Sequence, residues 1–295
     1  VFVTASHLPP EWNGMKISTG EGIPIPPTLI KEIIDENVQQ EPEFKGSVET
    51  ENLKKDYVTF MKSKFTPDKN LKIALDCGNG SMSLVAPEVF EEIGFKVTKI
   101  FCDVDPTFPN RPSEPSPANL KKLVETIKAG NFDFGVAFDG DGDRGILVDG
   151  KGRILTGNEI GILLGRYIFG DKKGKVVITV PCSLSMEREM RSLGAEIIKT
   201  PVGHTFVVSK CKDENALLGA EESGHMVLPE YFAFDDALLI PLKIAEIISE
   251  TGKSLAEQYY TMIIYPYEEI VFSCPEDAKF IVVRNQLEEF REIYD

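Results

Sequence analysis

The chain has 295 residues, of which 42% are hydrophobic and 27% are charged, and its formal net charge is −15 at pH 7. This composition excludes a compositionally disordered chain and supplies enough apolar side chains for two to three packed domains. The acidic balance argues against general binding to nucleic acid or to an anionic membrane surface. The sequence has no run of about 20 apolar residues that would predict a membrane-spanning helix.

The cysteines are few and scattered along the chain. There are five of them, and no pair has the CxxC spacing: Cys77, Cys102, Cys182, Cys211 and Cys274. An odd and scattered set argues against a disulfide framework and against a structural zinc site. We therefore expect a reducing, cytoplasmic setting.

One pattern recurs along the chain: an apolar strand, then a small or polar turn, then a helix. It is predicted at residues 1–6, 73–80, 134–143, 176–183 and 216–224. Strands that alternate with helices indicate an α/β fold with mixed, largely parallel sheets. In open sheets of this type, ligands bind beyond the carboxyl ends of the strands. We therefore expect the polar turns to converge on one central cleft.

The predicted helices have apolar faces that we assign to the core. They cover residues 49–64, as a charged connecting helix, and residues 119–129 and 236–250. The proline-rich stretch 106–117 cannot be helical, and we interpret it as a structural loop rather than a site. We expect domain boundaries near the connecting helix, near Gly152 and near Pro266.

The first candidate site follows the first strand. Small neighbours leave the hydroxyl of Ser6 accessible, and His7 beside it can donate to an anion or orient a phosphate. Lys16 follows a tight turn at residues 13–14. A serine at such a turn more often caps a helix, and that alternative stays open here.

The second candidate site is an acidic loop after the apolar run 134–138. Three carboxylates within six residues repel one another unless a cation neutralises them, and two alternating glycines let the backbone turn tightly enough for all three to point at one ion. Ligands that are all oxygen select a hard ion such as Mg²⁺, here with the ligands Asp139, Asp141 and Asp143. A solvated acidic turn is the alternative. A calcium-binding EF-hand loop fails, because its sixth position is Arg144 and its twelfth is Gly150.

The third candidate site is a glycine-flanked loop at residues 219–225. Its acids, serine and histidine can accept from and donate to vicinal hydroxyls, which suits a sugar: Glu221, Ser223 and His225. A helix N-cap with acidic residues in the first turn is the alternative. His204, which follows another apolar strand, is a weaker candidate for the same role.

A hydroxyl nucleophile, a hard metal site and a polyol loop together indicate phosphoryl transfer on a carbohydrate. Two other interpretations stay open. A phosphatase with Asp139 as its nucleophile leaves the Ser6 loop and the Glu221 loop unexplained. A protein that binds metal and sugar phosphate but turns over poorly, as a regulator or a fragment, is the non-enzyme alternative.

The chain resembles the α-D-phosphohexomutase superfamily, and most of all its phosphomannomutase/phosphoglucomutase branch. Three motifs carry the resemblance, in the order of the family: residues 4–9 with Lys16 resemble the phosphoserine loop, 139–144 the metal loop and 221–225 the sugar-binding loop. Residues 76–80 and 108–110 also resemble segments of the family's second domain. Two departures, Leu8 in place of the usual Asn and Pro181-Cys182 where many relatives have a Lys, affect sugar preference.

The resemblance implies four domains around a central cleft, of which this chain carries a part. The implied divisions are 1–52 (the end of domain 1, with the phosphoserine loop), 53–153 (domain 2, with the metal loop), 154–264 (domain 3, with the sugar-binding loop) and 265–295 (the start of an incomplete α+β domain 4). We expect a partial chain on this basis. Cytoplasmic location and a monomer or homodimer are also expected, with sugar phosphates as partners and neither nucleic acid nor membrane.

The resemblance also implies a mechanism and a role for each candidate residue. Ser6, carried as a phosphoserine, donates its phosphoryl group to a hexose monophosphate. The resulting hexose bisphosphate reorients, and its other phosphate returns to Ser6. The net reaction interconverts hexose 1-phosphate and hexose 6-phosphate, with mannose, glucose and, as an alternative, glucosamine as the sugar.

The implied cofactor is one Mg²⁺ per chain, held by Asp139, Asp141, Asp143 and a phosphoserine oxygen of Ser6. Arg144 pairs with a phosphoryl oxygen or fixes the loop. Lys16 and His7 serve proton transfer and phosphate contact beside Ser6. The sugar-binding residues are Glu221, Ser223, His225 and His204.

Overall fold

The computed structural model describes residues 1–37, 46–68, 70–170, 172–266, 273–275 and 277–294. The chain divides into two compact units, Val1–Ile264 and Tyr265–Asp295. The described part of the second unit contains the helix α10 (Lys279–Tyr294). Within the described residues, no helix combines the length and the apolar character needed to cross a membrane.

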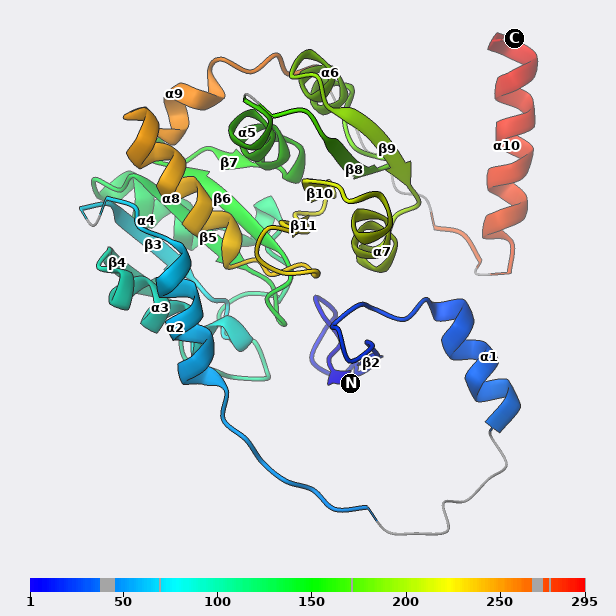
Figure 1. The fold of residues 1–295 in the computed structure, drawn as a ribbon, viewed down its shortest axis with the longest axis horizontal. Coiled ribbons are helices and arrows are strands. Elements are labelled where there is room, and N and C mark those ends of the chain that lie inside the picture. The colour runs from blue at the N-terminus through cyan, green and yellow to red at the C-terminus, as the bar shows by residue number, and fades with distance from the viewer. Residues whose placement is uncertain (38–45, 69, 171, 267–272, 276, 295) are drawn as a thin grey trace. The chain divides into compact units, whose positions relative to one another are not determined.

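The first unit contains a five-stranded sheet in the order β4-β3-β5-β6-β7 (Figure 1). Strand β3 pairs in parallel with β4 and with β5, while β5–β6 and β6–β7 are antiparallel. The strands are β3 (Lys72–Asp76), β4 (Lys96–Ile100), β5 (Phe134–Phe138), β6 (Gly145–Asp149) and β7 (Ile154–Leu155). The carboxyl ends of β3, β4 and β5 therefore lie at one edge of this sheet.

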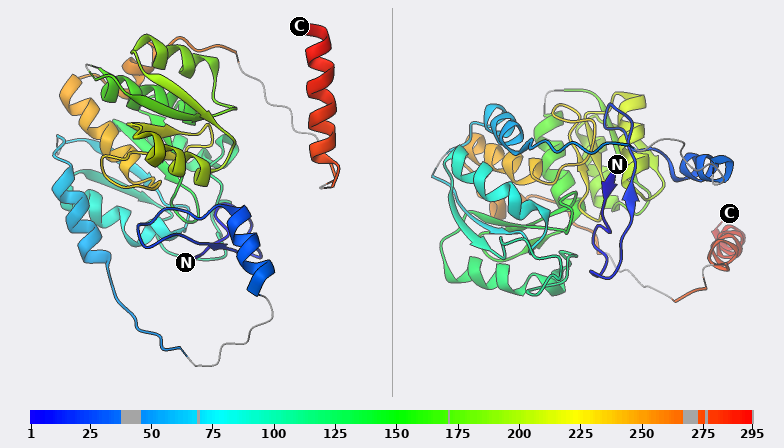
Figure 2. Two further views of the ribbon diagram at one scale, coloured as in Figure 1. Left: turned by 45° about the vertical axis from the view of Figure 1, so that its right-hand side comes forward. Right: turned by 90° about the horizontal axis from the view of Figure 1, so that it is seen from below.

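A second sheet has four strands in the order β11-β10-β8-β9. Strand β8 pairs in parallel with β9 and β10, and β10 pairs antiparallel with β11. The strands are β8 (Lys175–Thr179), β9 (Glu196–Thr200), β10 (Leu218–Ala220) and β11 (Met226–Val227). A separate two-stranded hairpin joins β1 (Phe2–Val3) to β2 (Met15–Lys16), and Figure 2 shows it from two further directions.

Alternation along the strands sends side chains to cores on opposite faces. In β3, Ile73 and Leu75 enter one large core, while Ala74 enters a smaller one on the other face. The large core also takes Val176 and Ile178 of β8, so the two sheets share it. Its helical contributors include α2 (Lys54–Lys64), α3 (Ala86–Ile93), α5 (Gly157–Phe169), α6 (Leu184–Ser192), α8 (Leu239–Thr251) and α9 (Leu255–Tyr259).

The opposite faces of the two sheets are covered by single helices. Helix α4 (Lys121–Ala129) packs Leu123 and Ile127 on the five-stranded sheet. Helix α7 (His204–Glu214) packs Val207 and Val208 on the four-stranded sheet. The unit therefore has the layered α/β architecture with mixed, largely parallel sheets that the sequence predicts. The remaining helix of this unit, α1 (Pro27–Asn37), follows the hairpin.

The repeated strand–turn–helix prediction is confirmed for β3 and β8 but is wrong at three places. Strand β1 leads into a hairpin with β2, and β5 and β10 lead through their loops into the antiparallel strands β6 and β11. The apolar segment 145–149 returns along β5 as the second strand of a hairpin, a pairing that local sequence periodicity does not reveal.

The predicted helix boundaries differ by a few residues from the observed ones. The connecting helix begins at Lys54 rather than at residue 49, and α4 begins at Lys121. Helix α8 begins at Leu239, because the carboxylate of Asp236 accepts a hydrogen bond from the backbone N–H of Leu238 at 2.9 Å and holds a turn there.

Candidate active site

The acidic loop 139–144 connects β5 to β6, whose ends Phe138 and Gly145 are paired. The Oδ1 atom of Asp139 accepts hydrogen bonds from the backbone N–H of Gly142 at 2.9 Å and of Arg144 at 3.2 Å. Gly142 has a φ of +81°, a left-handed conformation that favours glycine. The loop therefore curls around Asp139, and it brings carboxylate oxygens of Asp139, Asp141 and Asp143 within 4.8 Å of one another.

These carboxylates fit a divalent cation. Two of their buried oxygens, Oδ2 of Asp139 and Oδ1 of Asp141, have no hydrogen-bond partner. The buried Oδ1 of Asp143 has Nε2 of His225 at 3.2 Å. Buried carboxylate oxygens are costly to leave unsatisfied, and hard cations such as Mg²⁺ prefer oxygen ligands. Burial, and then the neighbouring carboxylates of Asp143 and Asp141, raise the pKa of Asp139 well above its usual range. The donor set is the one that the sequence predicts for magnesium.

Lys16 supplies positive charge to the same cluster. Its Nζ atom lies 2.8 Å from Oδ2 of Asp141 and also pairs with Oδ2 of Asp143. Burial alone would lower the pKa of Lys16, but the two carboxylates outweigh it and raise that pKa. The Thr4 hydroxyl donates to the same Asp141 oxygen at 2.9 Å. The hairpin is thus bound to the acidic loop by direct polar contacts.

The turn that carries Ser6 lies directly against the acidic loop. A Cβ added to Gly140 would stand 2.6 Å from the carbonyl oxygen of Ser6, so only glycine allows this approach. Ser6 itself has a φ of +54°, and its N–H donates to the Thr4 hydroxyl at 2.8 Å. The Ser113 hydroxyl also donates to the carbonyl oxygen of His7 at 2.7 Å. Contacts with the acidic loop and with Ser113 therefore hold the turn in place.

His7 and Arg144 meet next to the Ser6 hydroxyl. The Nδ1 atom of His7 lies 3.4 Å from Oγ of Ser6 and 2.6 Å from Nη2 of Arg144. Nη1 of Arg144 donates to both carboxylate oxygens of Glu114, at 3.2 and 3.1 Å. Burial, and then the Arg144 guanidinium, lower the pKa of His7. The Ser6 hydroxyl therefore has the His7 imidazole beside it, and the Arg144 guanidinium lies against that imidazole.

The glycine-flanked loop between β10 and β11 joins the acidic loop through backbone and side chains. Arg144 forms an isolated antiparallel bridge with His225, whose Nε2 lies 3.2 Å from Oδ1 of Asp143. Nδ1 of His225 lies 2.9 Å from Glu221 and 3.0 Å from the Ser223 hydroxyl. Although burial favours the neutral ring, Asp143 and Glu221 raise the pKa of His225 to about 10.

His204, at the start of α7, reaches the same cluster. Its ring stacks on that of His225 with centroids 5.8 Å apart, and its Nδ1 lies 3.3 Å from Oδ2 of Asp235. Oε2 of Glu221 faces His225, and Oε1 of Glu221 accepts a hydrogen bond from the backbone N–H of Gly203 at 2.9 Å. All of the residues that the sequence singles out thus belong to one connected cluster.

Sequence reasoning missed two members of the cluster, Glu114 and Asp235. Both Glu114 and Ser113 belong to the proline-rich stretch 106–117, whose sequence predicts a structural loop rather than a site. In the structure this stretch contacts the turn of Ser6 and His7 and also Arg144. Asp235 lies 3.8 Å from Nε2 of His225. The adjacent acids at 235 and 236 were the one available signal for it.

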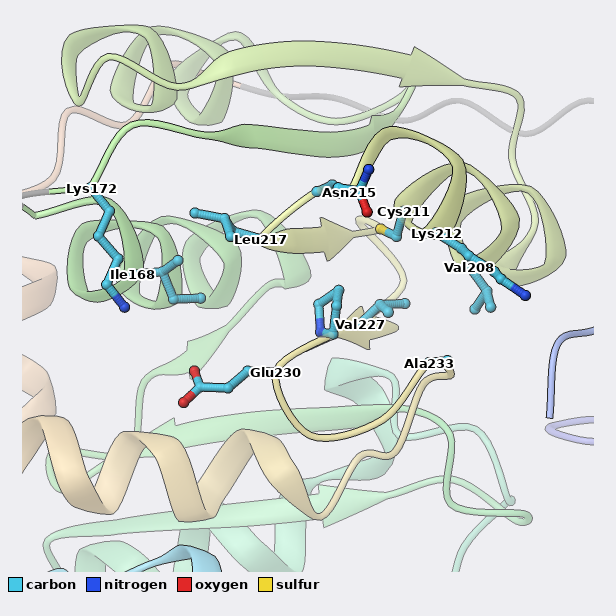
Figure 3. Close-up of a pocket in the computed structure, with 12 residues that line it drawn as sticks. Ile168, Lys172, Val208, Cys211, Lys212, Asn215, Leu217, Val227, Glu230 and Ala233 are labelled. Carbon is cyan, nitrogen blue, oxygen red and sulfur yellow. The ribbon is translucent and has the colours of Figure 1, made fainter. Parts of the chain in front are cut away.

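A separate cavity of about 590 Å³ lies on the four-stranded sheet, beside the end of α7 (Figure 3). Cys211 and Val227 contribute apolar lining, and Lys172, Lys212 and Glu230 contribute charged side chains. None of the predicted site residues lines it. The chemistry-bearing side chains therefore gather elsewhere, where the hairpin, the acidic loop and the loop between β10 and β11 meet.

Comparison with known proteins identifies relatives for most of the chain. Three family models match: phosphoglucomutase/phosphomannomutase α/β/α domain I over residues 1–43, domain II over 50–152 and domain III over 156–264. The chain is 32% identical to the Methanopyrus kandleri protein named "Probable phosphoglucosamine mutase", over 100% of this chain and 67% of that protein. It is 31% identical to the phosphomannomutase/phosphoglucomutase of Pseudomonas aeruginosa, over 96% of this chain and 62% of that protein.

A solved structure has the same fold. The phosphoglucomutase/phosphomannomutase family protein of Burkholderia thailandensis superposes with a TM-score of 0.79 and 28% identity, over 88% of this chain and 56% of that one. The chain thus spans about two thirds or less of the length of each of these three relatives.

Proposed function

The chain belongs to the phosphoglucomutase/phosphomannomutase family, and from this premise we propose that it takes part in phosphoryl transfer between the 1- and 6-positions of a hexose phosphate. The donor in this proposal is a phosphorylated Ser6, and the intermediate is a hexose bisphosphate. The observation that carries this proposal is the close contact between the Ser6 turn and the acidic loop. A Cβ added to Gly140 would lie only 2.6 Å from the carbonyl oxygen of Ser6.

The residues around Ser6 have chemistry that suits this transfer. A phosphoserine carries a charge of about −1.5 to −2, and three aspartates beside it would repel it strongly. Lys16 offsets part of this charge, and Arg144, held by Glu114 at 3.1 Å, presents a rigid guanidinium to a phosphoryl oxygen. His7, with its lowered pKa, can hold or release a proton at Nδ1, 3.4 Å from Oγ of Ser6.

Mg²⁺ is the cofactor that we assign to Asp139, Asp141, Asp143 and an oxygen of phosphorylated Ser6. Bound there, it would neutralise the negative charge that develops during transfer. The support is the set of buried carboxylate oxygens without hydrogen-bond partners.

We assign sugar binding to the second loop. Glu221, Ser223 and His225 offer acceptors and donors to vicinal hydroxyls, and His204 extends the same surface. Mannose, glucose and glucosamine phosphates are all candidate substrates, since relatives carry both kinds of name. The domain divisions 1–52, 53–153, 154–264 and 265–295, a monomeric or homodimeric state and a cytoplasmic location belong to the same proposal. The support for the location is the odd and scattered set of five cysteines in the sequence.

The test is transfer of label from a phosphate-labelled hexose 1,6-bisphosphate in the presence of Mg²⁺. The protein should gain acid-stable label on Ser6, and the Ser6→Ala variant should gain none. Acid-labile label that persists in Ser6→Ala would instead favour a phosphatase with an aspartyl nucleophile, since acyl phosphates hydrolyse readily. The geometry disfavours that alternative, because Asp139 is 1% exposed and its Oδ1 is engaged by two backbone N–H groups.

Binding without turnover is the remaining alternative for this chain. Calorimetric titration with a hexose phosphate would then show heat of binding, while the labelling experiment would show no phosphoserine. A version of the chain extended at both ends serves as the comparison, and label in neither version would contradict the mutase proposal.

A further inference from the structure

Two cysteines lie side by side just beyond the carboxyl ends of β3 and β4. Cys77 directly follows β3 and Cys102 follows β4, two strands that pair in parallel. Their Sγ atoms are 3.1 Å apart. The two sulfurs of a disulfide are about 2.05 Å apart. Side-chain rotation that brings the Sγ atoms about 1 Å closer would therefore allow the bond to form.

The two thiols differ in burial and in acidity. Cys77 is fully buried, while Cys102 is only partly buried. The hydrogen bond with Cys77 lowers the pKa of Cys102, while that hydrogen bond and burial raise the pKa of Cys77. Thiolate character and access together mark the thiol that reacts first with an oxidant, which here is Cys102, with Cys77 poised as the resolving partner.

The turn that carries Cys77 supports the acidic loop. The N–H of Ser81 donates to the carbonyl oxygen of Gly140 at 2.9 Å, and a Cβ added to Gly80 would lie 2.9 Å from the carbonyl oxygen of Asp139. The same turn is tied to the segment after β4, since the N–H of Asn79 donates to the carbonyl oxygen of Phe101 at 2.8 Å. Hydrogen bonds therefore link the backbone beside both cysteines to the backbone of the acidic loop.

We propose that Cys77 and Cys102 form an oxidisable dithiol, which a low-molecular-weight disulfide such as oxidised glutathione converts to an intramolecular disulfide, and that this closure weakens cation binding by the acidic loop. The thiolate of Cys102 attacks one glutathione sulfur, the S–S bond breaks and one glutathione thiolate leaves. The Cys77 thiol then loses its proton and attacks Sγ of Cys102, which releases the second glutathione. Two protein thiols are oxidised and one glutathione disulfide is reduced to two thiols.

The chain offers internal controls for this reaction. Cys182 and Cys211 are buried, and no thiol is described beside either of them. Cys274 is exposed and serves as a marker for simple surface modification. A Cys274→Ser background removes that thiol without touching the pair.

The experiment exposes the Cys274→Ser protein to oxidised glutathione and follows it by intact mass and by peptide mapping without reductant. The expected product is lighter by about 2 Da, contains a peptide that links residue 77 to residue 102, and returns to its original mass with dithiothreitol. Cys102→Ser should give no such product, and Cys77→Ser should stop at a stable glutathione adduct on Cys102. Absence of the linked peptide from the folded protein would overturn the proposal.

Mg²⁺ affinity, measured by calorimetry on reduced and oxidised protein, tests the coupling. We expect the Kd to rise about fivefold or more on oxidation and to recover on reduction. Unchanged affinity in the oxidised protein would overturn the coupling. The coupling to cation binding rests on the proposed metal site. A reduced protein that binds no Mg²⁺ would refute that site, whereas the mass analysis would still show whether Cys77 and Cys102 form a disulfide.

Discussion

The Gly140→Ala substitution tests whether the Ser6 turn must lie this close to the acidic loop. The added Cβ would stand 2.6 Å from the Ser6 carbonyl oxygen and 3.3 Å from both Cζ of Phe108 and Cβ of Ser113. Gly140 does not have a positive φ, so the substitution acts through steric contact and not through backbone strain. With neighbours on more than one side, the methyl group has no free direction.

The size of the effect follows from these distances. The Ser6 carbonyl must withdraw by roughly 0.8 Å to reach an ordinary contact of 3.4 Å. Overpacking of this kind costs about 1–3 kcal/mol of folding free energy. A displacement of about 1 Å at a reacting group lowers the rate by up to about 10²-fold. We therefore expect a folded variant with a large loss of phosphoryl transfer to Ser6 and a modest loss of stability.

The assay measures the initial rate of acid-stable labelling from the hexose bisphosphate, together with the thermal unfolding midpoint. Gly20→Ala is the matched control, because a Cβ at Gly20 meets nothing within 4 Å, and it should match the wild type in both measurements. A Gly140→Ala protein that takes up label at the wild-type rate would refute the reasoning that the close approach positions Ser6.

Three further predictions concern charge, pH and packing. The Lys16→Met substitution leaves the carboxylates of Asp141 and Asp143 without their cation, so in EDTA the variant should have a lower Tm than the wild type. Added Mg²⁺ should raise the Tm of the variant by more than it raises the Tm of the wild type. Equal Mg²⁺-induced shifts of Tm in calorimetry would contradict this. Burial, opposed by the Tyr57 hydroxyl, raises the pKa of Asp236 to about 6, so its contribution to stability is present below the unfolded pKa and is lost as pH rises through 6. Between pH 4 and pH 7 the wild type should therefore lose about 2 kcal/mol of unfolding free energy relative to Asp236→Asn in urea unfolding. Parallel pH profiles would count against a raised pKa. The Leu147→Ala substitution in the shared core should lower the free energy of unfolding by about 2–5 kcal/mol in the same assay. The exposed control Leu84→Ala should change the free energy of unfolding by no more than about 0.5 kcal/mol. Equal effects of the two substitutions would contradict the placement of Leu147 in the core.

The sequence predicted the strands better than the connections between them. The runs at 134–138 and 176–179 are apolar and short, and their ends are marked by polar turns, so β5 and β8 were evident. The element that follows a loop depends on which strand edge is open, which is a property of the whole sheet. For that reason the strand–turn–helix pattern is wrong after β5 and β10, where the antiparallel strands β6 and β11 follow.

The candidate site was predicted where one short segment carries its own chemistry. The acidic loop and the Ser6 turn are of this kind, and their residues meet in the structure. Glu114 and Asp235 are different, because each acquires its role from a partner outside its own segment: Arg144 is 30 residues from Glu114, and His204 is 31 residues from Asp235. A single sequence carries no record of such pairs, so they had to be found in the fold.

The apolar core shared by the two sheets restricts how this protein can evolve. A recombination event between the five-stranded and four-stranded halves would separate Leu147 and Leu155 from Ile160 and Leu242, which belong to the same buried cluster. Each half would then expose apolar surface that only its own partner fits. We expect the two halves to be inherited together, so that new substrate preferences arise by changes in the loops and not by exchange of modules.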